Sequence, residues 1–279
     1  MATTRRGRVA VIGAGPAGMA TALSVHQAGH DVVLLERYPQ ARAAGNILNL
    51  WPPPIKALGL MGVDIDDLGS PCHTEFRNIR GRRRVAVRLP GDVVRDYGGG
   101  FIGLLRPALY ERLVAALPPG VLQVNRRVDG FDQDETGVRL HLADGDVHEC
   151  DVLIGADGID SLVRRTLWGD APKREHNLHI FGGFVLDEDV KAQRGLCILT
   201  HSRPHLPYAA YGAGMATEDG YFIGRRLAGV DLRDHHAVRR ALQAYETPRK
   251  PHTARQSQQA FILGKVFHHA PRPSRSSAT

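Results

Sequence analysis

The 279-residue sequence contains few cysteines and no long apolar run. Its three cysteines, Cys72, Cys150 and Cys197, are far apart and show no Cys-x-x-Cys spacing, which argues against a disulfide framework or zinc knuckle and favours a reducing compartment. No run of about 18 apolar residues could span a bilayer, and the apolar segment after the basic N-terminus ends at Ile12, too early for a signal peptide. We therefore expect a cytoplasmic protein without a membrane span.

Lysine and aromatic residues are also scarce. Only five of the 36 basic residues are lysines, and aromatic residues make up 6% of the chain. The formal net charge of +7 is compatible with either a nucleic acid or an anionic cofactor. The densest basic run, residues 80–88, has no interleaved aromatic residue and precedes a strand-like alternation. We interpret it as a solvated hairpin and expect no nucleic-acid partner.

The apolar content is sufficient for a folded core. Hydrophobic residues make up 43% of the chain, which excludes a disordered protein. A length of 279 residues is compatible with one large domain or two modest ones.

The N-terminal part alternates strand and helix patterns. Residues 8–12 predict a buried strand, 16–28 a helix that Gly29 ends, and 31–35 a second strand, which together form a βαβ unit. Further strands are predicted over residues 121–124, 137–142, 147–150 and 151–155, with a hairpin over 74–95. Further helices are predicted over 107–117, 161–167, 217–228 and 235–260, the last interrupted by Pro248 and Pro251. Residues 271–279 are rich in Ser, Pro and Arg, and we expect them to be disordered.

A glycine-rich motif joins the first strand to the first helix. It reads Gly13-Ala14-Gly15-Pro16-Ala17-Gly18, and its position between a strand and a helix indicates a dinucleotide site. The first glycine permits a tight turn, the second lets the backbone approach a pyrophosphate, and the third allows the helix to pack closely on the strand. Glu36 ends the second strand, where its carboxylate can accept hydrogen bonds from ribose hydroxyls. A carboxylate there disfavours a 2′-phosphate, so FAD or NAD is expected before NADP.

A second match to this glycine pattern, residues 98–103, lacks the required context. Polar residues precede it and Pro107 follows closely. We interpret it as a flexible loop.

The downstream segments distinguish FAD from NAD. The relevant segments are Gly13–Gly18 with Glu36-Arg37, Leu105-Arg106-Pro107 before a helix, Gly155–Arg164, and Gly212–Met215 with Glu218-Asp219-Gly220. With these segments the chain resembles the FAD-dependent aromatic-ring monooxygenases of the para-hydroxybenzoate hydroxylase type. The resemblance implies FAD as cofactor, NAD(P)H as co-substrate, dioxygen, and a small aromatic substrate.

The resemblance also implies an α/β fold with a Rossmann-like FAD-binding domain assembled from discontinuous segments. We assign residues 1–73, 98–174 and 204–264 to that domain. Residues 74–97 and 175–203 would be the strands of a reduced β-sheet substrate domain, and 265–279 a disordered tail. The sequence does not determine the oligomeric state.

Several residues are implied to bind the nucleotide part of FAD. Glu36 and the adjacent Arg37 belong to the ribose end, and Val128 resembles the position whose backbone meets the adenine. Arg106 would reach the pyrophosphate or ribityl chain, unless it is an ordinary surface arginine. Asp157 would contact the ribityl and pyrophosphate region and take part in NAD(P)H binding, unless it only caps the helix that follows.

A second group is implied to surround the isoalloxazine ring. Arg42 and Gly45 resemble the loop that flanks this ring. Gly212, Gly214 and Met215 would precede a helix, so their N–H groups would stabilise negative charge at the flavin N1 and C2 oxygen. Because the cofactor carries the redox chemistry, no catalytic acid or base is assigned.

The chain departs from the family pattern between Asp157 and Gly212. The family's Gly-Asp motif, whose aspartate binds the ribityl chain, is missing from residues 197–207. This interval is also too short for the family's substrate sheet, so the chain looks internally shortened, with residues 181–184 and 195–201 as a remaining edge. His201 and His205 lack a carboxylate partner at helical spacing, so no metal site is expected.

Other functions are kept as alternatives. The resemblance predicts an active monooxygenase, and the shortened interval leaves a catalytically impaired flavin binder or a fragment as the alternative. In an NAD-dependent dehydrogenase the Asp157 segment would have no role. A halogenase would require a Trp-x-Trp segment, which Trp51 and Trp168 do not form.

Overall fold

The computed structural model describes residues 7–41, 47–78, 80, 82–170, 196–201 and 212–269. Its strands are β1 (Arg8–Ile12), β2 (Asp31–Leu35), β3 (Ile47–Leu50), β4 (Ser70–Pro71), β5 (His73–Asn78), β6 (Arg83–Val87), β7 (Ile102–Leu105), β8 (Leu122–Gln123), β9 (Val128–Asp134), β10 (Gly137–Leu142), β11 (Val147–Cys150), β12 (Val152–Gly155) and β13 (Leu196–His201). Its helices are α1 (Pro16–Gln27), α2 (Pro52–Leu60), α3 (Gly91–Tyr97), α4 (Arg106–Ala116), α5 (Leu162–Trp168), α6 (Gly212–Leu227) and α7 (His235–His269).

A parallel sheet in the order β12-β1-β2-β8 forms the centre of the fold. β1 lies between β12 and β2, with Val11 aligned with Ile154 on one side and Leu34 on the other. The predicted βαβ unit is therefore confirmed, and the expected α/β class with it. The carboxyl ends of β1, β2 and β12 meet at one edge of the sheet, which is where ligands bind in open α/β sheets.

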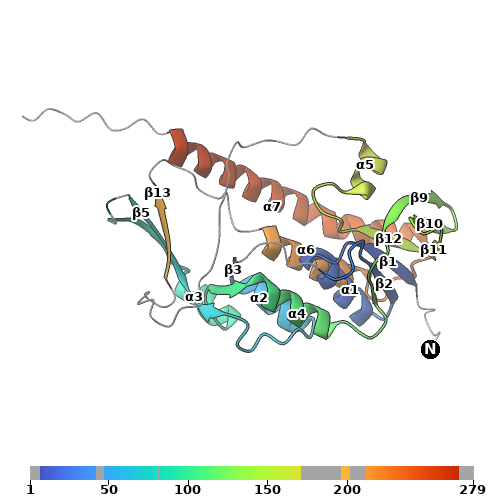
Figure 1. The fold of residues 1–279 in the computed structure, drawn as a ribbon, viewed down its shortest axis with the longest axis horizontal. Coiled ribbons are helices and arrows are strands. Elements are labelled where there is room, and N and C mark those ends of the chain that lie inside the picture. Colours follow the sequence, from blue (N-terminus) through green and yellow to red (C-terminus); the bar gives the residue numbers. More distant parts are fainter. Residues whose placement is uncertain are drawn as a thin grey trace, which may run out of the picture.

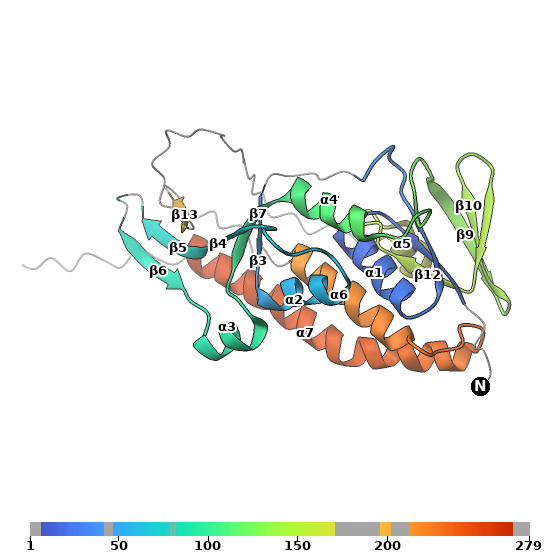
Figure 2. The same cartoon turned by 90° about the horizontal axis from the view of Figure 1, so that it is seen from below.

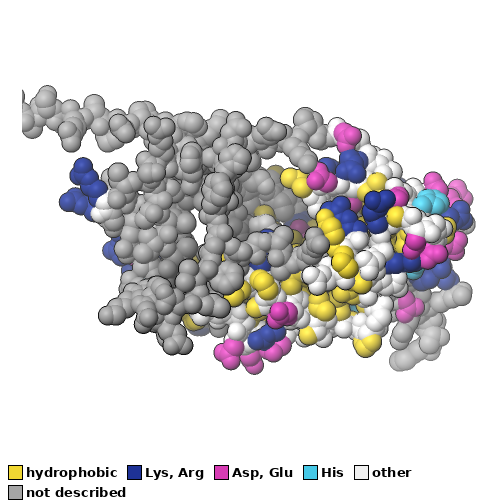
Figure 3. All heavy atoms as spheres, in the orientation of Figure 1, with side chains coloured by type: hydrophobic (Ala, Val, Ile, Leu, Met, Phe, Trp, Pro, Cys, Tyr) yellow, Lys and Arg dark blue, Asp and Glu magenta, His cyan; other side chains and the backbone are white. Residues whose placement is uncertain are grey.

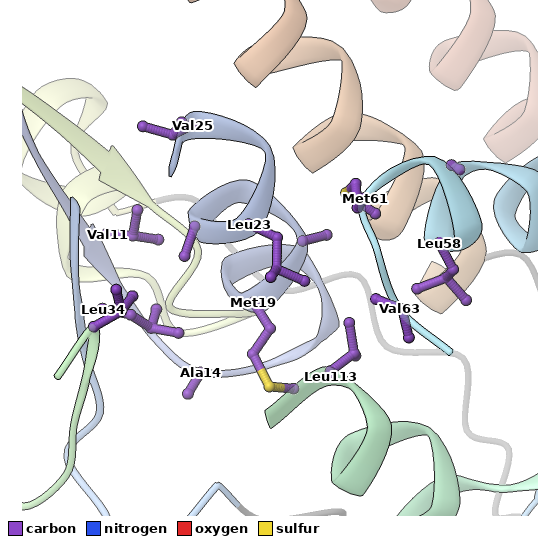
Figure 4. Packing of buried hydrophobic residues seen from close by; sticks show 14 of the residues in the cluster. Val11, Ala14, Met19, Leu23, Val25, Leu34, Leu58, Met61, Val63 and Leu113 are labelled. Carbon is purple, nitrogen blue, oxygen red and sulfur yellow. The ribbon is translucent and has the colours of Figure 1, made fainter. Parts of the chain in front are cut away.

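Alternate residues of β1 point to two different hydrophobic clusters. Val9 and Val11 pack with α1, whereas Ala10 and Ile12 pack against the antiparallel sheet β11-β10-β9 through residues such as Leu140. This alternation follows from the two-residue period of a strand, and it explains why β1 is apolar from Val9 to Ile12. Figure 4 shows one of these clusters, in which α1 lies between the sheet and the helices α2 and α4.

Two smaller sheets, in the orders β3-β7-β4 and β13-β5-β6, complete the described part of the chain. In Figures 1 and 2, β5, β6 and β13 lie at the opposite end of the molecule from β9 and β10. β5 and β6 form the predicted hairpin, and the described basic side chains Arg80, Arg82 and Arg88 are exposed. β13 pairs in parallel with β5, so residues 196–201 form a strand of this sheet.

Helix α6 packs on α1 at unusually close range. A Cβ atom at Gly220 would lie 2.5 Å from the backbone N of Thr21, and one at Gly224 would overlap the Ser24 side chain. The Ser24 hydroxyl also donates to the Tyr221 carbonyl at 2.9 Å. Because Gly220 and Gly224 carry no side chain, the backbones of α6 and α1 can approach each other. This contact brings together residues that are about 200 positions apart in the sequence.

Both C-terminal helices differ from the prediction. α6 begins at Gly212 instead of residue 217. The glycines of its first turn are poor helix formers on their own, but Gly214 packs against the Trp51 ring, and this contact fixes the turn. α7 continues through Pro248 and Pro251 to residue 269. Both prolines are exposed and three positions apart, so the carbonyls that lose a hydrogen bond can face water. Residues 265–269, predicted as part of a disordered tail, are therefore helical.

Other predicted boundaries were also wrong. Helix α3 covers residues 91–97, of which 91–95 were placed in the hairpin segment, and it ends at Gly98 in the left-handed conformation (φ +75°). The predicted loop 98–103 is strand from Ile102 onward. On α4, Leu109 and Leu113 are buried and Val114 is 38% exposed. β3, α2 and β9 were not predicted.

The described residues contain no helix that is both long and apolar enough to cross a bilayer. Cys150 is a buried free thiol. In Figure 3, Lys and Arg side chains lie among Asp and Glu side chains on the described part of the visible face.

The segments 171–195 and 202–211 lie outside the described residues, together with the predicted edge strand 181–184 and His205.

Substitution of Gly224 by leucine should destabilise the fold by about 2 to 3 kcal/mol, because the new side chain would overlap Ser24 and push α6 away from α1. Urea unfolding measures this loss. Gly91→Ala is the matched control, because no atom lies within 4 Å of its added Cβ. Equal stability of the two variants would contradict the close packing of α1 and α6.

Candidate functional site

The turn between β1 and α1 is shaped by three glycines. Gly13 has φ +99°, its N–H donates to the Leu35 carbonyl at 2.8 Å, and a Cβ there would lie 2.6 Å from the Ala156 carbonyl. A Cβ at Gly18 would overlap the Gly13 carbonyl, whereas a Cβ at Gly15 would have no atom within 4 Å. Gly13 and Gly18 therefore meet neighbouring backbone, and the side of Gly15 is open space.

The first turn of α1 borders this open space. Gly15 is the N-cap residue and Pro16 the first helical residue, and the turn contains neither a side-chain cap nor an acidic residue. The free N–H groups and positive end of such a helix attract an anion. Ala14 is buried and Ala17 partly buried at the same place.

Glu36 joins the carboxyl end of β2 to this turn. Its side chain is buried, Oε2 accepts a hydrogen bond from the Ala14 N–H at 2.8 Å, and Oε1 accepts one from the Tyr38 N–H at 3.0 Å. A carboxylate can accept about four hydrogen bonds, so acceptor capacity remains on both oxygens. Arg37 is exposed, and its guanidinium lies 4.9 Å from the centroid of the Tyr38 ring.

Asp157 follows β12 and lies beside Gly13, where a Cβ on the glycine would be 2.9 Å from the Asp157 Cα. Its Oδ2 accepts hydrogen bonds from the N–H groups of Leu162 at 2.6 Å and Val163 at 3.4 Å, so it caps α5. Its Oδ1 is buried and has no partner among the described residues. One oxygen is therefore structural and the other is available to a ligand.

Arg106 and Arg164 each present a buried Nε without a partner among the described residues. Arg106 is the first residue of α4, and α4 packs on α1. Arg164 lies in α5, where its backbone N–H donates to the Ser161 hydroxyl at 3.0 Å. Buried polar atoms are nearly always hydrogen-bonded, so these donors and the free Asp157 oxygen point to a bound polar group.

Val128 begins β9 and is buried in the same cluster as Ile12 and Leu35, at the carboxyl ends of β1 and β2. The Arg126 N–H donates to the Glu36 carbonyl at 2.8 Å and holds this segment against the site. Arg42 and Gly45 lie outside the described residues.

The first turn of α6 contains Gly212, Gly214 and Met215, which were predicted to precede the helix and are instead part of it. Gly212 is exposed, Gly214 is buried against Trp51, and Met215 is partly buried. Because this is the start of the helix, its N–H groups lack partners within the helix, as the prediction required.

Arg249 of α7 holds this turn in place, although the sequence analysis did not identify it. Its Nη2 donates to the Met215 carbonyl at 3.1 Å and pairs with Glu218 at 2.9 Å, and its Nε pairs with Asp219. Burial alone would lower the pKa of Arg249, but Asp219 and Glu218 outweigh it and raise that pKa. The only sequence signal was an arginine between the two prolines of α7.

The structure thus brings together the glycine turn, Glu36, Val128 and Asp157 at the carboxyl edge of the central sheet. Arg106 and the first turn of α6 belong to helices that both pack on α1. Open space at Gly15, the unpartnered Nε donor of Arg106 and an unpartnered Asp157 oxygen fit a dinucleotide with its pyrophosphate at the start of α1.

Residues 6–195 match a known family, described as "FAD binding domain". The chain belongs to this FAD-binding family. The cofactor expected from the sequence, FAD, is therefore confirmed, together with the resemblance to flavoproteins.

The relatives of this FAD-binding chain carry the names of aromatic monooxygenases. A 6-hydroxynicotinate 3-monooxygenase of Bordetella bronchiseptica is 37% identical over 171 residues, which cover 60% of this chain and 45% of the relative. A protein of the same name from Pseudomonas fluorescens is 31% identical over 237 residues, covering 81% of this chain and 61% of the relative. The chain thus spans about half to three fifths of the length of these relatives.

The fold of the FAD-binding chain is also found in solved structures. Klebsiella pneumoniae HpxO complexed with FAD and uric acid superposes with a TM-score of 0.73 and 18% sequence identity, covering 96% of this chain and 90% of that chain. This similarity confirms the fold expected from the resemblance.

Substitution of Arg249 by methionine should destabilise the protein by about 2 to 4 kcal/mol, because it leaves the Glu218 and Asp219 carboxylates without their cation. Denaturant unfolding measures the change. Lys250→Met, which removes an exposed pair with Glu246, should change stability by less than about 0.5 kcal/mol. If both variants unfolded at the same denaturant concentration, the Arg249 cluster would not hold α7 to α6.

Proposed function

We propose that this protein is an FAD-dependent monooxygenase that uses NAD(P)H and dioxygen to hydroxylate an aromatic or related electron-rich small molecule. The observation that carries the proposal is the open space at Gly15, together with an unpartnered Asp157 oxygen, in a chain with relatives that are named aromatic monooxygenases. Their names refer to hydroxylated rings such as 6-hydroxynicotinate and 3-amino-4-hydroxybenzoate, which supports a substrate of that kind.

The nucleotide half of FAD would lie along the carboxyl edge of the sheet. The N–H groups at the start of α1 would bind the pyrophosphate beside Gly15, because no side chain fills that space. Glu36 would accept a hydrogen bond from a ribose hydroxyl while retaining its bond from Ala14. Val128 and Arg37 would lie at the adenosine end.

The flavin half would lie between α4, α5 and α6. Arg106 would donate to the pyrophosphate or ribityl chain, and the free oxygen of Asp157 would accept from the ribityl chain and take part in NAD(P)H binding. Gly212–Met215 would direct the N–H groups of α6 at the flavin N1 and C2 oxygen, where the helix start favours negative charge. Arg42 and Gly45 would flank the ring.

Bound FAD supplies the redox chemistry, accepting hydride from NAD(P)H and activating dioxygen. The protein's own residues bind and orient the cofactor, and no side chain is assigned as a general acid or base.

We also propose the division into an FAD-binding domain over 1–73, 98–174 and 204–264 and a small substrate sheet. The buried free thiol of Cys150 supports a reducing location such as the cytoplasm.

Substitution of Gly15 by valine should abolish FAD binding and leave the fold intact, because the new side chain would enter space that no protein atom occupies. The test compares flavin absorption of the purified protein and NAD(P)H oxidation with and without hydroxylated aromatic acids. Gly130→Val is the control, since its added Cβ also meets no atom but lies in β9. Wild-type protein without bound or bindable FAD, or without substrate-stimulated oxidation and a hydroxylated product, would refute the proposal.

Substitution of Asp157 by asparagine should weaken FAD binding about tenfold without destabilising α5. The asparagine amide oxygen can still accept the hydrogen bond from the Leu162 N–H. The amide NH₂ then takes the position of the unpartnered Asp157 oxygen and presents donors to FAD where the carboxylate presented an acceptor. Asp160→Asn removes the same charge from an exposed neighbour and should leave affinity unchanged. Titration of each apoprotein with FAD measures the effect, and equal affinities of the two variants would exclude Asp157 as a ligand.

A further inference from the structure

A pocket of about 450 Å³ lies between α2, α6 and α7, outside the FAD cleft. Its lining includes none of the glycine turn, Glu36, Arg106 or Asp157, and the two regions share only Met215. Its volume lies within the range of sites for small organic ligands. The question is which ligand its walls would recognise.

Four aromatic side chains line the wall. Trp51, Tyr97, Tyr221 and Phe222 come from the segments around α2, α3 and α6. Three of the protein's exposed large hydrophobic residues, Leu60 at 53%, Tyr97 at 41% and Phe222 at 43%, line this one opening. Apolar side chains that stay exposed around one opening indicate a binding surface, and rings at several angles suit a planar aromatic ligand.

The charges of the pocket favour an anion. Glu218 lines it, but Arg249 neutralises this carboxylate by an ion pair of 2.9 Å. The other carboxylate bound by Arg249, Asp219, is not a lining residue. Lys56 lies at the wall with its Nζ 5.2 Å from the centroid of the Tyr97 ring, and no carboxylate among the described residues forms an ion pair with it.

We propose that this pocket is a second small-molecule site, for a planar aromatic carboxylate, with its ring against Trp51 and Phe222 and its carboxylate at Lys56. The aromatic wall supplies dispersion and stacking, and the lysine supplies the counter-charge at the mouth. The site does not depend on FAD, because its walls are protein side chains from α2, α3, α6 and α7.

The intrinsic fluorescence of Trp51 provides a direct test. The chain has two tryptophans, and Trp168 lies on α5 with 77% of its surface exposed, so a W168F background leaves Trp51 as the reporter. We expect benzoate to change this fluorescence saturably, and benzamide, a planar neutral analogue, to bind at least tenfold more weakly. Cyclohexanecarboxylate, which carries the charge without the planar ring, should also bind more weakly.

Substitution of Lys56 by methionine should weaken benzoate binding about tenfold and leave benzamide binding unchanged, whereas Lys56→Arg should retain benzoate binding. Lys250→Met is the charge-matched control, because Lys250 is on α7 but does not line the pocket. The absence of a saturable benzoate signal, equal benzoate affinity of the Lys56→Met and Lys250→Met variants, or equal affinity for benzoate and benzamide would overturn the proposal. Because Trp51 packs on Gly214 of the turn proposed to bind the flavin, all variants are compared at the same measured flavin content, and no result depends on monooxygenase activity.

Discussion

The close approach of two loops, at Gly13 and at Ala156-Asp157, is the constraint on which the site depends. The backbone of one loop occupies the place where a Gly13 side chain would be, and β1 and β12 pair in register immediately before it. This contact sets the position of the Asp157 carboxylate beside the start of α1. It also explains why position 13 needs glycine, since a Cβ there would meet the Ala156 carbonyl.

The parts of the fold with strong local signals were predicted closely from the sequence. β1, β2, β10 and β11 have the expected bounds, because short apolar runs and the Asp144-Gly145 turn define them without tertiary context. Helix α3 was missed because its two valines suggest a strand, although Asp92 in its first turn and Gly98 after its last were helix signals. The first turn of α6 was missed because its order comes from Trp51, far away in the sequence.

The sequence motifs named part of the candidate site. Motif spacing identified the glycine turn, Glu36 and Asp157, and the structure shows that Asp157 is both a helix cap and a source of a free oxygen, which had been treated as alternatives. Sequence alone did not find Arg249, since nothing in its surroundings shows that it reaches Met215 on another helix. Long-range polar contacts of this kind carry no periodic signal.

The order of the central strands has a consequence for how the protein forms during synthesis. Asp151 accepts a hydrogen bond from the N–H of Arg8, and 143 residues separate them. At cellular translation rates, β12 leaves the ribosome about 7 to 30 seconds after β1. During that time the apolar edge of β1 lacks its partner, and closing so long a loop is entropically costly. During this interval the unpaired edge of β1 in the nascent chain can bind another strand or a chaperone. The interval ends when β12 is made.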